Sequence, residues 1–108
     1  MINVVLSRCC TGKLNGFTVD GHAAYAPKGE DIICAAVSVL AQAAVLGLTE
    51  HLGLRPDVEI RDGYLRCILS PGSADSPGVQ AILKTLELAL KDIATGYPNR
   101  IRCKEVQT

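Results

Sequence analysis

A nearly continuous apolar segment from residue 32 to residue 48 predicts a long helix. Four residues interrupt the apolar side chains, namely Cys34, Ser38, Gln42 and Gly47. The segment reaches only the lower length limit for a membrane span, about half of it is alanine and other small residues, and no basic flank orients it. A buried helix therefore fits better. Because one small sheet cannot cover a helix that is apolar on nearly all sides, a second copy is expected to pack against it in a homodimer.

A second helix is predicted from Pro77 to Gly96, with Ser76 as its N-cap. Its apolar residues recur at three- and four-residue steps, in Val79, Ile82, Leu83, Leu86, Leu90 and Ile93. Its charged residues fall mainly on the other side, in Lys84, Glu87, Lys91 and Asp92. We interpret this charged side as a solvated face.

Strand patterns lie before and between the helices. Residues 2–9 are rich in β-branched and apolar types, and a second strand follows from Phe17 toward Gly21. Residues 57–62 and 64–70 flank the strong hairpin turn Asp62-Gly63. The return strand places Leu65, Cys67 and Leu69 on one face, so Cys67 is expected to be an inert core thiol. Residues 99–105 are a candidate for a last short strand.

The predicted order of elements is β-β-α-β-β-α with a possible final strand. This order predicts an α+β fold of two layers, with the helices on one small antiparallel or mixed sheet. We interpret residues 1–108 as a single domain, large enough to bury roughly two-thirds of its unfolded surface. Hydrophobic residues make up 48% of the chain, yet there is no Trp and one Phe, so the core must be aliphatic.

Candidate chemistry gathers between the second strand and the first helix. His22 follows the strand, and an eleven-residue loop that contains a proline and a glycine separates it from Cys34. Neither helix nor strand is expected through residues 23–33. With Asp31 as the N-cap, Cys34 is the third helical residue, where unpaired backbone N–H groups and the helix dipole favour thiolate over thiol. A histidine across a short loop supplies the base that such a nucleophile needs.

The residues alone leave a plainer alternative open. Cysteine is among the most buried residue types and the neighbours of Cys34 are apolar, so Cys34 also fits an inert core position. His22 equally fits a surface histidine at a strand end. His51 is excluded as the base within one subunit, because it lies roughly 25 Å from Cys34 at the helical rise of about 1.5 Å per residue.

Two segments resemble the signature of the ribosomal-processing cysteine proteases. The first is Gly21-His22-Ala23-x-Tyr25, and the second is Gly29-x-Asp31-Ile32-Ile33-Cys34-Ala35-Ala36-Val37-Ser38. Residue types and loop length agree together through 21–38, and the resemblance extends over nearly the whole chain. The one minor departure is Ile33, where valine is expected.

The resemblance implies a cysteine endopeptidase with His22 and Cys34 as its catalytic dyad and without a cofactor. Gly21 then leaves backbone room beside His22. Asp31 caps the helix, orients the imidazole, or does both. Ser38 lies one turn beyond Cys34, where it either donates a hydrogen bond toward the thiol or bonds back to the helix carbonyls.

The resemblance also implies the substrate. Such proteases remove a short N-terminal extension from a large-subunit ribosomal protein whose mature N-terminus reaches toward the peptidyl-transferase centre. Cleavage follows an aromatic or apolar pair and precedes a basic stretch, and a substrate of this shape is expected to bind extended along a strand edge. Two other classes stay open. One is a non-catalytic ribosome-associated binding module in which Cys34 only packs, and the other is a thiol hydrolase or acyltransferase of small molecules.

Charge and cysteine content narrow the remaining classes. Eleven basic residues balance eleven acidic ones, which argues against direct binding of nucleic acid through a basic surface. The start of the chain lacks a basic n-region and an apolar h-region, which predicts a cytoplasmic protein without a membrane partner. Five cysteines at irregular spacings, without a CxxC pair, indicate neither a disulfide framework nor a metal site.

Overall fold

The computed structural model describes the backbone of residues 1–21 and 28–108, and the side chains of residues 1–21 and 32–108. Its elements follow the predicted order, and the candidate final strand is present. They are β1 (Ile2–Arg8), β2 (Leu14–Asp20), α1 (Lys28–Leu46), β3 (Asp57–Arg61), β4 (Tyr64–Ile68), α2 (Pro77–Gly96) and β5 (Ile101–Gln107). A π-helical turn, Gly47–His51, prolongs α1, and a short 3₁₀ turn, Ser73–Asp75, precedes α2.

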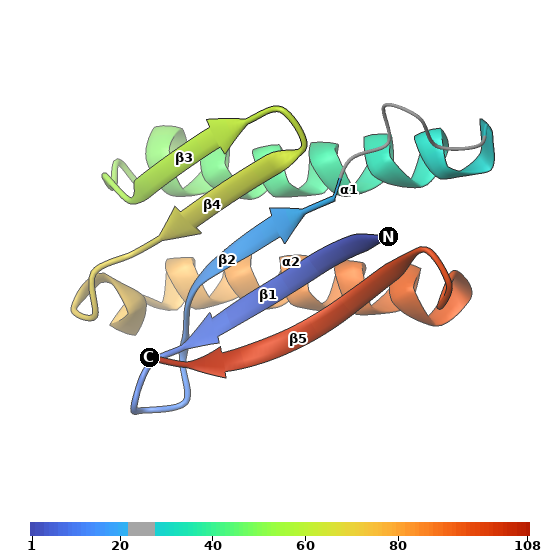
Figure 1. The fold of residues 1–108 in the computed structure, drawn as a ribbon. Helices are drawn as coiled ribbons and strands as arrows, with labels where there is room; N and C mark the ends of the chain where they lie inside the picture. Colours follow the sequence, from blue (N-terminus) through green and yellow to red (C-terminus); the bar gives the residue numbers. More distant parts are fainter. Residues whose placement is uncertain (22–27) are drawn as a thin grey trace.

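The strands form one mixed sheet in the order β3-β4-β2-β1-β5. Neighbouring strands are antiparallel except β1 and β5, which run parallel. Both helices cover the same face of this sheet, α1 behind β3 and β4 and α2 behind β2 and β1 in the view of Figure 1. The fold is therefore the predicted two-layer α+β arrangement, with the parallel pair making the sheet mixed.

The core lies between the sheet and the two helices. Cross-strand pairs such as Val4–Val19 and Leu6–Phe17 turn their side chains toward the helices, and Phe17 is fully buried. The rest of the core is aliphatic, as the composition predicts. Burial of apolar surface stabilises a fold by about 25 cal/mol per Å². The apolar side chains on this one face of the sheet therefore hold the sheet and the helices together.

Only one side of α1 is buried. Ile33, Val37, Ala41, Ala44 and Leu48 face the core, at the three- and four-residue steps of a helix. The opposite side remains apolar but exposed, and by length and composition alone the helical segment Ile32–His51 could cross a membrane. The sheet therefore covers one side of α1 and leaves the opposite, apolar side exposed.

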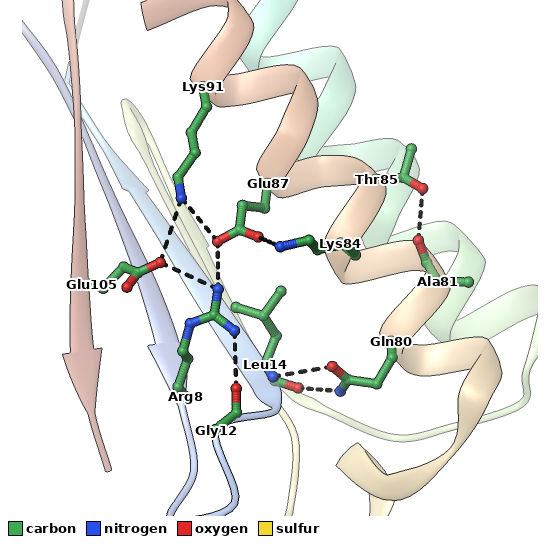
Figure 2. A network of polar contacts seen from close by, with 10 residues as sticks. All are labelled: Arg8, Gly12, Leu14, Gln80, Ala81, Lys84, Thr85, Glu87, Lys91 and Glu105. Carbon is green, nitrogen blue, oxygen red and sulfur yellow. Dashed lines mark hydrogen bonds and ion pairs between the residues drawn. The ribbon is translucent and has the colours of Figure 1, made fainter.

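The charged face of α2 departs from its prediction at one residue. Glu87 is fully buried, and its carboxylate accepts hydrogen bonds from Arg8 (2.7 Å), Lys84 (2.6 Å) and Lys91 (3.3 Å), as Figure 2 shows. Arg8 and Lys91 also pair with Glu105 of β5, at 3.2 and 3.5 Å. The interpretation of a solvated face was wrong here because helical periodicity does not reveal that β1 brings an arginine against this turn.

Candidate functional site

Cys34 lies in the second turn of α1. The helix begins at Lys28, so that Cys34 is its seventh residue and Asp31 its fourth. The Cys34 side chain is partly buried and packs against the core cluster. It therefore points toward the sheet from a rigid helical backbone.

This placement corrects three expectations from the sequence. Asp31 is not the N-cap, because it lies inside the helix, and residues 28–33 are helical although a loop was predicted through 23–33. A proline obstructs a helix only on its N-terminal side, so a proline in the sequence before Lys28 is compatible with a helix that begins there. Since the field of a helix terminus fades beyond its first turn, Cys34 is also not held at the positive end of the dipole as predicted.

A cavity of about 200 Å³ opens beside Cys34. One wall is formed by α1, through residues such as Val37 and Ala41. The β3–β4 hairpin supplies the opposite wall, residues 60–65, and the ends of β1 and β2 close the floor. Such a cavity is large enough for one apolar side chain, because an apolar cavity of about 150 Å³ can hold a benzene molecule.

Gly21 lies at the floor of this cavity, where the chain leaves β2. Its φ of 146° lies in a region that residues with a side chain rarely adopt. Its N–H donates to the carbonyl oxygen of Gly63 at 3.0 Å. A Cβ atom added here would lie 2.6 Å from both the Met1 carbonyl oxygen and the Ile2 Cα. Gly21 therefore lies in close contact with two other backbone segments, whereas the predicted room beside His22 stays a prediction.

We expect Gly21→Ala to destabilise the fold by roughly 1–3 kcal/mol, because both the φ angle and the contacts with backbone atoms oppose a methyl group. Thermal unfolding followed by circular dichroism measures the effect. The control is Gly72→Ala, since Gly72 has an ordinary φ of −64° and a methyl group added there would meet nothing within 4 Å. Equal melting temperatures for the two variants would contradict this prediction.

The other residues of the predicted site differ in what the structure says of them. Ser38 is exposed, lines the same cavity as Cys34, and its Oγ accepts a hydrogen bond from Gln42 Nε2 at 2.8 Å. Its hydrogen bond toward the thiol stays a prediction. His22 lies outside the described residues, and so does the side chain of Asp31. The pairing of His22 with Cys34 and any contact of Asp31 with the imidazole are therefore not tested.

Three other cysteines, which do not line this cavity, have shifted pKa values. Cys67 is fully buried, which confirms its predicted core position, and burial raises the pKa of its thiol to about 11. Burial likewise raises the pKa of Cys103. A hydrogen bond with the Thr11 hydroxyl (3.0 Å) lowers the pKa of Cys9, in the turn after β1. Among the described residues, no group of three or more His, Cys, Asp or Glu side chains is arranged to hold a metal ion.

The cavity wall contributed by the β3–β4 hairpin was not singled out from the sequence. Ile60, Tyr64 and Leu65 line the same cavity as Cys34. The alternation in residues 57–62 and the turn at Asp62-Gly63 predict the hairpin, but nothing local predicts that it folds over α1. The site is thus assembled from four separate segments: the start of β1, the end of β2, α1 and the β3–β4 hairpin.

Known proteins resemble this chain in sequence and structure. The family described as cysteine protease Prp matches residues 1–102. The ribosomal processing cysteine protease Prp of Staphylococcus aureus (strain NCTC 8325 / PS 47) is 30% identical over 105 residues, covering 94% of this chain and 96% of that protein. A crystal structure of Prp from S. aureus with a substrate peptide has a TM-score of 0.87 at 28% identity, covering 98% of this chain and 100% of that chain. Another, with a covalently linked product peptide, has a TM-score of 0.81 at 29% identity and the same coverage.

Proposed function

Because this chain belongs to the Prp family of ribosomal processing cysteine proteases, we propose that its peptidase activity rests on a dyad of Cys34 and His22. The observation that carries this proposal is the shared cavity. Cys34 lines it from α1, and Gly21, the residue directly before His22 in the sequence, lines it from the end of β2. A nucleophile and a base attached at two sides of one cavity can meet over a bound peptide.

The proposed reaction uses the ordinary steps of a thiol protease. His22 takes the proton of Cys34, and the thiolate attacks the carbonyl carbon of the scissile peptide bond. The tetrahedral intermediate collapses to a thioester while His22 protonates the leaving amine, and water then hydrolyses the thioester. The S. aureus relative with a covalently linked product peptide supports a covalent route of this kind.

The position of Cys34 in α1 means that His22 has a larger part in activating the thiol than the sequence suggested. In the second helical turn the helix dipole contributes little to the stability of a thiolate. We therefore assign the proposed lowering of the Cys34 pKa to the His22 imidazole. Alkylation by iodoacetamide as a function of pH tests this, with the modified cysteine identified by peptide mass. Cys34 should react well below pH 8.5, the ordinary thiol pKa, and His22→Ala should remove that early reaction. A Cys34 that alkylates like an ordinary thiol in the wild type would contradict the dyad.

Two thiols serve as internal references in the same alkylation experiment. Cys67 should remain unmodified in the folded protein, since it is fully buried and its pKa is raised to about 11. Cys10 is exposed, so it should be alkylated in the folded protein. Its reaction should not change in His22→Ala, so site-resolved detection distinguishes the two reactive thiols.

We propose that the substrate is an N-terminally extended large-subunit ribosomal protein in the cytoplasm. The relatives named for ribosomal processing support this substrate class, and the complex of the S. aureus protease with a substrate peptide supports a peptide as the substrate. Mixing this chain with the extended ribosomal protein should yield a product shortened by its extension, detected by mass. Binding without trimming would favour the ribosome-associated module, and turnover of small thioesters alone would favour the thiol hydrolase.

We further propose that the active form is a homodimer joined through the outer face of α1. Ile32, Val39 and Leu46 recur every seven residues and are 73%, 65% and 57% exposed. Residues at this spacing lie on one side of a helix. Beside this stripe, an apolar groove of about 360 Å³ runs between α1 and α2. A second copy would cover both without burying a charge.

Val39→Glu should convert the dimer to a monomer, because a carboxylate would be buried without a partner at the centre of the stripe. Sedimentation equilibrium measures the change. Val106→Glu is the matched control, since Val106 is also an exposed apolar residue but lies on β5. A wild-type monomer that binds phospholipid vesicles would instead assign the stripe to a membrane surface.

A further inference from the structure

Among the residues that the structure describes, β3 is an edge strand with one side unpaired. In the sheet order it pairs with β4 alone. The pair Arg61–Tyr64 closes a two-residue turn, Asp62-Gly63, and such a closing pair exchanges hydrogen bonds between its two strands. The next pair, Ile60–Leu65, is then a non-hydrogen-bonded pair. The N–H and C=O of Ile60 therefore point away from β4, toward the free side.

The side chain of Ile60 is uncovered on the face where the helices lie. Its cross-strand neighbour Leu65 belongs to the core and is 7% exposed, whereas Ile60 itself is 65% exposed. Sheet residues opposite one another point to the same face, so the helix layer ends before it covers Ile60. The same side chain forms part of the cavity wall beside Cys34.

We infer that the substrate peptide binds as an additional strand on the free edge of β3, with Ile60 as the residue that pairs with it. This inference rests on the proposed function and specifies how its peptide is held. The peptide main chain satisfies the outward N–H and C=O of Ile60, and an apolar side chain of the peptide covers Ile60 and enters the cavity. An extended peptide held in this way exposes its scissile carbonyl to attack from α1.

Charge does not oppose this arrangement. The ionic side chains of β3 alternate away from the helix layer, where Asp57 pairs with Arg66 at 2.9 Å and Glu59 with Arg61 at 3.0 Å. The residues that face the helix layer from this strand are Val58 and Ile60, both apolar. The edge of β3 therefore offers main-chain N–H and C=O groups for hydrogen bonds, and apolar side chains on the side of the helix layer. That combination fits an extended peptide with alternating apolar side chains.

An experiment can distinguish pairing through the peptide main chain from binding through side chains alone. In a strand added to a sheet, only every second amide of the peptide faces the neighbouring strand. Methylation of single amide nitrogens along a cleavable peptide should therefore lower kcat/KM by about tenfold or more at alternate positions, since each removes one hydrogen bond and adds a clash. The intervening positions should stay within about threefold of the unmodified peptide. A profile without this alternation would overturn the inference.

Variants of Ile60 test the protein side of the same contact. Proline is tolerated in an edge strand where the N–H faces outward, so Ile60→Pro should keep the fold while losing the donor. We expect kcat/KM to fall about tenfold for Ile60→Pro relative to Ile60→Ala, which lacks the side chain but keeps the N–H. Circular dichroism monitors folding. Equal activities of Ile60→Pro and Ile60→Ala would overturn the inference.

The controls separate this inference from the function on which it depends. If the wild type does not cleave the unmodified peptide, the proposed function fails and the inference fails with it. If the wild type cleaves the peptide but neither the methylation series nor Ile60→Pro has an effect, only the inference fails. If Ile60→Pro changes the sedimentation of the protein from dimer to monomer, the β3 edge belongs to a second copy, which also overturns it.

Discussion

Cys34→Ala should leave a folded protein that trims its substrate slower by a factor on the order of 10⁴ or more, since removal of the nucleophile abolishes the covalent route. The side chain is partly buried against the core, and alanine fills most of its volume, so the expected loss of stability is about 1 kcal/mol. Product formation by mass and thermal unfolding by circular dichroism measure the two effects separately.

Cys103→Ala is the matched control for this substitution. Cys103 has the same intermediate burial as Cys34 but lies on β5, and burial raises the pKa of its thiol. We expect its removal to leave kcat/KM within about twofold, because a neutral thiol away from the cavity takes no part in the reaction. Retained trimming by Cys34→Ala would favour the binding module in which Cys34 only packs.

The second large effect is expected on stability, at Glu87. Glu87→Gln keeps the size of the side chain but removes the charge that Arg8, Lys84 and Lys91 surround (Figure 2). The expected loss is roughly 2–4 kcal/mol, because the carboxylate is fully buried and three charge-assisted hydrogen bonds are weakened together. Urea denaturation at pH 7 measures it. Glu105→Gln is the control, and it should cost under about 1 kcal/mol since that carboxylate is half exposed.

The loss at Glu87 should also depend on pH in a defined window. Burial by itself would raise the pKa of this carboxyl, but hydrogen bonds from Lys84 and Lys91 and the charge of Arg8 outweigh it and lower the pKa to about 2, from 4.5. Between these values the unfolded chain binds the proton and the folded one does not, so stability rises with pH there. The difference between the wild type and Glu87→Gln should be complete above about pH 5 and shrink as the pH falls toward 2. A difference that stays constant over this range would contradict the network.

Local patterns were sufficient to predict the elements and to single out Cys34 as a candidate nucleophile. The three- and four-residue steps from Val79 to Ile93 predict α2 because helical periodicity is written along the chain itself. The turn Asp62-Gly63 predicts the β3–β4 hairpin because only a few residue types accept its backbone angles. Cys34 and His22 were singled out through a contiguous motif, whose residue types and loop length can be recognised without coordinates. Of this pair, the described residues place Cys34 alone, at the cavity.

Three features of the structure could not be predicted from local patterns. Asp31 resembles an N-cap by type, but the helix begins three residues earlier, at Lys28, because a favourable capping residue does not by itself fix where a helix starts. Glu87 resembles a solvated residue until Arg8 of β1 meets it. Ile60 resembles a core residue by alternation, yet the helix layer stops short of it. Periodicity along a chain orients a side chain toward a face, whereas burial, charge pairing and cavities arise from the segment that packs opposite, which is distant in sequence.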